Sequence, residues 1–296
     1  MFSSIKKKWK SEIFAWSLLF PSLLLLTVFT FYPIGITIVQ SFYEKNLAVI
    51  EPSFTAFANY KHLFADDIFH KVMINNFWYM IGTVPTSIGI GLIFAIFANK
   101  ALKFRGFVRT SFFYPNVVPM IALANIWLFI YTPEYGLLSR LTNFLHMGNV
   151  SWLGSETWVM TALTIMMIWK EAGYFMIFYL AGIQNISPEI YEAAKIDGIH
   201  PFKVFWRITF PLLMPTTLFV LIVALTNSFK TVDQLFVMTQ GGPNNSSNLL
   251  LYYIYQQAFA FWDYGMAAAA TVIMILIMLV MTILQFFGMD KKIHYR

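Results

Sequence analysis

The sequence predicts an all-α polytopic membrane protein with six transmembrane helices, and three observations support this prediction. First, the chain of 296 residues is 58% hydrophobic and only 11% charged, whereas a soluble domain has about 25% charged residues. Second, the apolar residues are collected in six long runs, each near the roughly 20 residues that a helix needs to cross a bilayer. Third, the charged residues lie almost entirely between those runs.

Six apolar segments have the length of spanning helices. Four lysines near the N-terminus precede a run that is longer than the short apolar core of a signal peptide. We therefore expect an uncleaved first span, long enough to tilt or to project beyond the bilayer. The expected spans are 13–42, 72–98, 108–131, 157–183, 208–230 and 265–288, in one membrane domain of residues 13–288 between tails of residues 1–12 and 289–296.

Proline and small residues occur within or at the edges of these spans. Proline often marks a kink in a membrane helix, because it lacks an N–H and its ring disturbs the preceding turn. Small residues let a neighbouring helix approach closely, so we favour packing over a ligand role for them. The prolines are Pro21, Pro33, Pro85, Pro115, Pro119, Pro211 and Pro215, and the small residues of the second span are Gly82, Ser87, Gly89, Gly91 and Ala95.

The distribution of Lys and Arg predicts the orientation, since cytoplasmic loops carry an excess of these residues. The N-terminal tail has four, the 99–109 loop four, the 184–207 loop three and the C-terminal tail three. The alternate loops have three, one and one. Both termini and the 184–207 loop are therefore expected in the cytoplasm. Because the basic residues follow the membrane pattern instead of forming one patch, no nucleic-acid partner is expected.

Several chemistries have no support in the sequence. The chain has no Cys, which excludes disulfides, thiolate metal sites and Cys nucleophiles. Its five His are dispersed, so no metal site is expected. No G-x-x-x-x-G-K-[ST] phosphate loop, zinc-protease motif, nucleophile elbow or dinucleotide fingerprint occurs. We expect no cofactor and no enzymatic activity in this chain, so any ATP must be bound by another chain.

A polar segment lies between the fourth and fifth spans. Ser187 suits the N-cap of a helix and Pro188 its first turn, and the helix is expected to reach Asp197. Gly198 can end this helix in the left-handed conformation, and Pro201 can begin a second short helix. The resulting helix, bend and helix make a compact cytoplasmic projection within residues 185–207.

This projection is suited to docking on a cytoplasmic partner. Two adjacent alanines would allow close seating in a groove, and an acidic side chain could pair with a basic residue of the partner. The alternative is an amphipathic helix on lipid headgroups, but the loop has as many acids as bases, which disfavours anionic lipid. The candidate docking residues are Glu192, Ala193, Ala194, Asp197 and Gly198.

The segment from Glu192 to Pro211 reads E-A-A-x3-G-x9-I-x-F-P and resembles the EAA loop of ABC importer permeases. It departs from that pattern at Ile199, where the family often has Ala, and at Phe210, where it usually has Leu. The resemblance extends over about residues 13–288 and points to the carbohydrate and glycerol-phosphate class, of the first-permease type. Its further motifs are Tyr32-Pro33 with Ser41-Phe42, Trp169 with Gly173, Ala181-Gly182-Ile183-Gln184, and Thr239-Gln240-Gly241-Gly242-Pro243.

The resemblance implies a type I ABC importer permease architecture in the bacterial cell membrane, with a cytoplasmic coupling helix that enters a cleft on an ATPase. It also implies the partners of such a permease. They are a second homologous permease subunit, two ATP-binding subunits that hold ATP and Mg, an extracytoplasmic substrate-binding protein, and a sugar or related polyol phosphate as substrate.

Ionisable side chains at membrane depth are costly and therefore indicate function. Lys170 and Glu171 lie near the middle of the fourth span, and such groups suit a polyhydroxylated ligand, a phosphate or a carboxylate. The resemblance to ABC importer permeases implies that residues at the end of the fifth span also contact substrate. The alternative is an ion pair or hydrogen-bond network between helices. The candidate substrate-path residues are Lys170, Glu171, Tyr174, Asn227, Ser228 and Thr231.

Two other functions compete with an ATP-driven importer. A proton-coupled secondary transporter could use Glu171, although no pair of inverted repeats is visible. An intramembrane enzyme is the other alternative, but the sequence has no His/Asp, Ser/Lys or metal-binding constellation at membrane depth.

The extracytoplasmic segment 231–264 is turn-rich at its centre, and we expect residues 249–260 to form a helix packed on the bundle. Trp152, Trp158 and Trp262 are expected at the membrane interface, where Trp is enriched.

Overall fold

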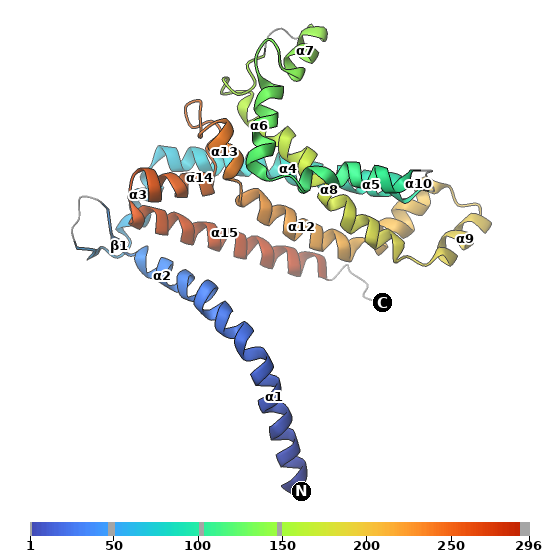
Figure 1. The fold of residues 1–296 in the computed structure, drawn as a ribbon, viewed down its shortest axis with the longest axis horizontal. Coiled ribbons are helices and arrows are strands. Elements are labelled where there is room, and N and C mark those ends of the chain that lie inside the picture. The colour runs from blue at the N-terminus through green and yellow to red at the C-terminus, as the bar shows by residue number, and fades with distance from the viewer. Residues whose placement is uncertain (1, 47–50, 101–103, 147–149, 291–296) are drawn as a thin grey trace. The chain divides into compact units, whose positions relative to one another are not determined.

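The computed structural model describes residues 2–46, 51–100, 104–146 and 150–290, which are mostly helical (Figure 1). Within these residues, five helices are long and apolar enough to cross a membrane, and a sixth crossing results if one bent pair counts as a single span. The chain divides into two compact units, Met1–Ala65 with Ile254–Ile273 and Asp66–Tyr253 with Met274–Arg296, and each is described by itself.

The first unit contains one long N-terminal helical segment, a two-stranded hairpin and a short helix. Its elements are α1 (Phe2–Leu26), the π-helical turn η1 (Thr27–Phe31), α2 (Tyr32–Gln40), β1 (Tyr43–Glu44), β2 (Ser53–Phe54), α3 (Ala58–Ala65) and the π-helical turn η4 (Gln256–Ala260), and it shares α14 (Leu250–Tyr255) and α15 (Tyr264–Asp290) with the second unit.

The π-helical turn has a visible cause in the sequence. The Tyr32 N–H donates to the carbonyl of Thr27, five residues earlier, immediately before Pro33. Because proline lacks an N–H and its ring crowds the preceding turn, one wider turn accommodates it. The expected first span is confirmed as Phe14–Gln40. The expected tail of residues 1–12 is helical from Phe2, and residues 291–296 of the other expected tail lie outside the described residues.

Side-chain amides and backbone groups join the rest of the first unit. The Asn59 Nδ2 donates to the carbonyls of Ser41 and Tyr43, each at 2.9 Å. The Tyr264 N–H donates to the carbonyl of Lys45 at 2.9 Å, so the start of α15 lies against the hairpin.

The second unit contains the remaining helices. They are α4 (Asp67–Asn99), α5 (Arg105–Phe113), the 3-10 turn η2 (Tyr114–Asn116), α6 (Met120–Tyr131), α7 (Leu137–Phe144), α8 (Val159–Gln184), α9 (Pro188–Ile196), α10 (Pro201–Val204), the π-helical turn η3 (Phe205–Thr209), α11 (Phe210–Leu212), α12 (Met214–Phe229) and α13 (Asp233–Met238).

The core of the second unit lies between α4, α8 and α12. α4 and α8 pack along each other, and α12 contacts both. Phe175 and Tyr179 of α8 are fully buried there, together with Leu213 just before α12. The expected packing role is confirmed for Gly91, because a Cβ at that position would lie 2.9 Å from the Cβ of Phe175. This tight contact holds α8, the helix with the ionisable residues, in a fixed place beside α4.

The expected third span, 108–131, is not one straight helix. α5 with η2 and α6 form a pair bent by 96°, and α6 turns away from α5 in Figure 1. Pro119 stands at the N-cap of α6 with an extended backbone (ψ 140°). A residue in that conformation interrupts the helix, and Pro115 and Pro119 supply no N–H to bridge the break. The prolines were visible in the sequence, and the expected segment is present as a bent pair of helices, Gly106–Asn116 and Met120–Tyr131, instead of one continuous helix.

The bend is held against α8 by two contacts. The Asn116 Nδ2 donates to the carbonyl of Lys170 at 3.0 Å. Gly173 faces the carbonyl of Phe112 so closely that a Cβ on Gly173 would overlap it. The backbone of the bend therefore needs a glycine on α8 at this position.

Replacing Gly173 with Ala is expected to destabilise the folded chain, because the methyl group would push the bend away from α8. Overpacking of this kind costs about 1–3 kcal/mol or more. Thermal unfolding in detergent measures the effect. Gly89→Ala is the matched control, since a Cβ there meets nothing within 4 Å and Ala favours helix by about 1 kcal/mol. Equal stability of both variants would contradict the proposed close contact.

The segment after α13 is tied to the start of α4. The Lys71 Nζ donates to the carbonyl of Asn244 at 2.6 Å and lies 4.0 Å from a carboxylate oxygen of Glu156. The Ser246 hydroxyl donates to Glu156 at 3.2 Å. The helix expected within 249–260 is confirmed as α14 with η4, and Leu250 and Tyr253 of α14 are buried.

The expected position of Trp152 is wrong. Its side chain is 6% exposed and packs between Tyr131 and Trp158, with ring centroids 5.8 and 5.4 Å away. A short loop folds it inward onto the bent pair, so this Trp belongs to an aromatic cluster of the protein interior. Trp262 is 45% exposed, as an interfacial residue would be.

Candidate functional site

The polar loop after α8 forms the expected helix, glycine bend and second helix. Ser187 occupies the N-cap of α9, but its hydroxyl donates to the carboxylate of Glu189 at 2.9 Å instead of capping a backbone N–H. At the other end, the Gly198 N–H donates to Lys195 and the Ile199 N–H to Ala194. These two bonds form a Schellman motif, and Gly198 has the required positive φ of 66°.

The outward face of α9 combines charge with exposed apolar surface. Glu192, Ala193 and Asp197 are exposed, as expected for a docking surface. Ile196 is 86% exposed, and the sequence pattern did not single it out. Ala194 is only 4% exposed and packs within this chain, so it supports the loop from inside and is not part of the outward face.

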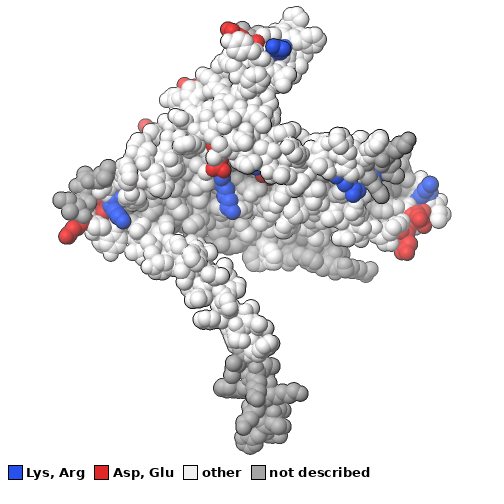
Figure 2. Space-filling model, viewed as in Figure 1, with Lys and Arg blue, Asp and Glu red and all other residues white. Residues whose placement is uncertain are grey.

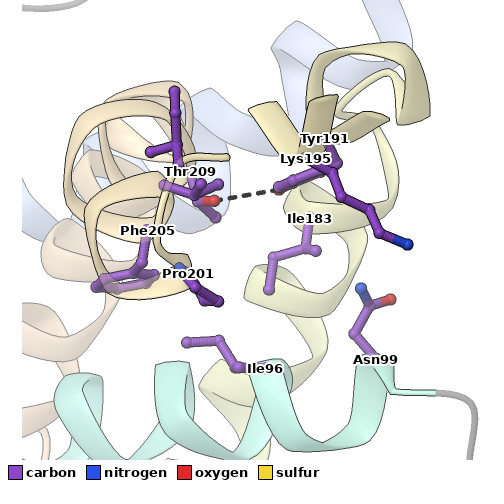
Figure 3. Close-up of a pocket in the computed structure, with 10 residues that line it drawn as sticks. Ile96, Asn99, Ile183, Tyr191, Lys195, Pro201, Phe205 and Thr209 are labelled. Atoms are coloured by element: carbon purple, nitrogen blue, oxygen red, sulfur yellow. Dashed lines mark hydrogen bonds between the residues drawn. The ribbon is translucent and has the colours of Figure 1, made fainter. Parts of the chain in front are cut away.

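A hydrogen bond links the two arms of the loop. The hydroxyls of Tyr191 on α9 and Thr209 in η3 lie 3.2 Å apart, as Figure 3 shows. They border an apolar cavity of about 430 Å³ that also touches the ends of α4 and α8. The cavity is lined by Ile96, Asn99, Ile183, Tyr191, Lys195, Ile199, Pro201, Val204, Phe205 and Thr209. Apart from its covalent connections, the loop therefore meets the ends of α4 and α8 through side chains that surround this cavity.

Charged side chains mark this end of the second unit. Figure 2 shows acidic and basic side chains together where the chain carries α9, whereas the surface of the neighbouring helices is mostly uncharged. The loop is therefore a polar tip on an apolar body.

A second polar site lies near the middle of α8, where Glu171 faces α12. The Asn227 Nδ2 donates to both carboxylate oxygens of Glu171, at 3.1 and 3.2 Å. Glu171 is 8% exposed. Both residues border an open cavity of about 230 Å³ lined by Met120, Met167, Lys170, Glu171, Asn227, Lys230, Thr231, Asp233 and Gln234.

Buried hydroxyl and amide groups extend this site toward α4. Thr231 is 3% exposed, and its hydroxyl donates to the Tyr79 hydroxyl at 3.4 Å. The Gln234 Nε2 lies 3.5 Å from the same Tyr79 oxygen. The network therefore connects α4 with the end of α12 and the start of α13.

The six expected path residues separate into three groups. Lys170, Glu171, Asn227 and Thr231 line the open cavity. Ser228 lines only a neighbouring hollow of about 10 Å³ behind Glu171. Tyr174 is absent from the cavity lining and packs on Phe175 and Phe178 instead.

Sequence reasoning missed five cavity residues, which are Met120, Met167, Lys230, Asp233 and Gln234. Met167 lies on α8, one turn before Glu171. Met120 reaches the cavity because the chain bends immediately before it. The other three follow α12, where its last turn ends at Phe229. A signal for them was present, since Lys230 is the one basic residue in its loop. Among the described residues, no group of three or more His, Cys, Asp or Glu could hold a metal ion.

Comparison with known proteins places this geometry in a family. The family model described as "Binding-protein-dependent transport system inner membrane component" matches residues 87–288. The chain is 30% identical to the sn-glycerol-3-phosphate transport system permease protein UgpA of Agrobacterium fabrum, over 96% of this chain and 97% of that protein. It is 31% identical to the lactose transport system permease protein LacF of Rhizobium radiobacter, over 98% of each chain.

The fold also matches a solved structure. A chain of a bacterial alginate ABC transporter, in complex with an alginate pentasaccharide-bound periplasmic protein, superposes with a TM-score of 0.80. The alignment covers 96% of this chain and 95% of that chain at 21% identity, so it bears on the fold alone. Together with the family match over most of the membrane helices, these comparisons show that the chain belongs to the binding-protein-dependent transport system inner membrane components.

Proposed function

We propose that this chain is the membrane-spanning permease subunit of an ABC importer that carries a sugar or a related polyol phosphate into the cytoplasm. The observation that carries the proposal is the outward face of α9, a glycine-terminated helix that presents Glu192, Ala193 and Ile196 at the tip of an apolar helical body. Relatives named for glycerol-3-phosphate and lactose transport support the substrate class.

The loop is placed to move the two helices that frame the polar cavity. α9 follows the end of α8, and η3 leads through α11 into α12. Glu171 lies thirteen residues before the end of α8, or about 20 Å at the rise of an α-helix. A displacement of α9 therefore moves α8 relative to α12. The hydrogen bonds between Glu171 and Asn227, which join these two helices, change with that movement. We propose that this movement opens and closes the cavity.

The proposed assembly contains further chains. Two ATP-binding subunits supply ATP, Mg and the hydrolysis step, and each permease docks one coupling helix on them. A second homologous permease completes the substrate path, and an extracytoplasmic binding protein delivers the substrate. Both termini of this chain lie in the cytoplasm. In the cavity, Lys170, Glu171, Asn227 and Thr231 offer hydrogen-bonding groups to hydroxyls.

ATP dependence of uptake tests the proposal against a proton-coupled carrier. Membrane vesicles containing the complete system are expected to accumulate labelled sugar when ATP is present, also after a protonophore has abolished the proton gradient. Glu171 would be the coupling residue of a carrier. Uptake by this chain alone, driven by the gradient and independent of ATP, would replace the importer with the secondary transporter.

A further inference from the structure

The segment that follows the glycine bend, residues 201–210, has an outward face of mixed character. Phe202 is 68% exposed and Trp206 is 51% exposed. Their ring centroids lie 6.3 Å apart, and Phe210 continues the row 5.3 Å beyond Trp206. Lys203 and Arg207 are exposed beside this aromatic row. Two parallel stripes result, one aromatic and one basic.

The inward face of the same segment is already occupied. Pro201, Phe205 and Thr209 line the cavity beneath the loop, and Figure 3 shows them on its border. Thr209 is 7% exposed. The aromatic and basic stripes therefore point away from the helices of the second unit.

In the part of the chain that the structure describes, the basic stripe has no acidic partner. Glu189 and Glu192 lie on α9, and neither Lys203 nor Arg207 forms an ion pair among the described residues. Counting the acids and bases of the whole loop together gave equal numbers, so the count did not show that the two kinds of charge lie on different arms. The acids belong to the docking helix, and the second arm carries net positive charge.

The chain leads from this segment directly into a membrane helix. The apolar segment with the length of a span begins at Met214, and residues 201–210 precede it, at the position expected for the boundary between water and bilayer. Trp and Tyr concentrate at that depth, and basic residues beside a spanning helix attract anionic lipids. A row of aromatic side chains beside two basic side chains is typical of protein segments that lie in the headgroup layer of a membrane.

We propose that the outward face of residues 201–210 lies in the cytoplasmic headgroup layer and binds anionic phospholipid. Phe202 and Trp206 enter the layer beside the acyl chains, while Lys203 and Arg207 contact lipid phosphates. The lipid thereby holds the second arm of the loop in place, and α9 moves relative to it.

Lipid quenching of a fluorophore tests this contact, because the chain has no Cys and one introduced Cys can be labelled alone. The full-length Phe202→Cys chain, labelled and placed in phosphatidylcholine vesicles, is titrated with brominated phosphatidylglycerol or brominated phosphatidylcholine. Phe202 is mostly exposed, so its replacement leaves the fold intact. We expect stronger quenching by phosphatidylglycerol. Adding Lys203→Gln and Arg207→Gln should reduce this preference about fivefold for each charge.

Ile196→Cys on α9 is the control position, where quenching by aqueous iodide and none by either lipid is expected. Adding Lys195→Gln to the labelled Phe202→Cys chain is the charge control, and it should leave the preference for phosphatidylglycerol unchanged. Iodide quenching without lipid quenching at position 202 would overturn the proposal. A preference for phosphatidylglycerol that remains after both Lys203→Gln and Arg207→Gln would also overturn the proposal. Loss of lipid quenching in the complete complex with its ATPases would assign this face to the ATPase instead.

Discussion

Gly198→Val is expected to abolish substrate uptake while the chain still reaches the membrane in normal amount. Gly198 has a φ of 66°, and a Cβ there would meet nothing within 4 Å. The penalty therefore comes from the backbone alone. A left-handed residue other than Gly costs roughly 1–2 kcal/mol, and a β-branched one costs more. The valine favours a different backbone at the end of α9, which is expected to turn its outward face away from the proposed ATPase partner.

Gly198→Asn provides the matched control, because Asn adopts the left-handed conformation more readily than other residues. We expect this variant to keep most of the uptake of the unmodified chain. Immunoblotting of membranes and uptake of labelled sugar measure the two effects separately. Normal uptake by Gly198→Val would show that the geometry of the bend is unimportant, and equal loss in both variants would remove the backbone explanation.

Glu171→Gln is expected to raise the KM of uptake about tenfold or more, without loss of folded protein. Gln can still accept a hydrogen bond from Asn227, which now lies 3.1 Å from the carboxylate, so the link between α8 and α12 survives. What disappears is the charge that faces the open cavity. A hydrogen bond to a charged group contributes roughly 1.5–3 kcal/mol, which corresponds to the expected change in KM.

The control for Glu171 lies on the neighbouring helix. Thr226 is adjacent to Asn227 in sequence but borders a different hollow, beside Met278 and Gln285. Thr226→Val should leave the KM unchanged. If Glu171→Gln lowers the unfolding temperature and does not change the KM, then Glu171 only holds two helices together and is no substrate contact.

Local backbone features were accessible from the sequence because their causes are local. Ser187 acts through the nearby Glu189 side chain, and Pro188 and Gly198 act through their own backbone conformations, so the limits of α9 followed from residue types alone. The run of small residues in the second span likewise predicted a close helix contact, which Gly91 makes. The membrane spans themselves followed from composition and length.

The bend before α6 could not be predicted in the same way, since proline allows both a kinked helix and a broken one. The choice depends on whether another element packs against the break. Here α8 does so, because Gly173 leaves room for the carbonyl of Phe112 and the Lys170 carbonyl accepts a hydrogen bond from Asn116. The cavity depends on the bend, because Met120 reaches it only through the change of direction. The burial of Trp152 likewise depends on Tyr131 of α6, which is distant in sequence.

Substrate-stimulated ATP hydrolysis by the purified complex tests the central claim, that α9 couples an ATPase to this permease. The complex is purified through this chain and assayed with and without candidate pairs of binding protein and sugar. We expect an ATPase and a second permease to copurify, and one sugar to stimulate hydrolysis, with the stimulation lost in Glu192→Ala. A chain that purifies alone, or a complex whose stimulated hydrolysis is unchanged in Glu192→Ala and Gly198→Val, would contradict coupling through α9.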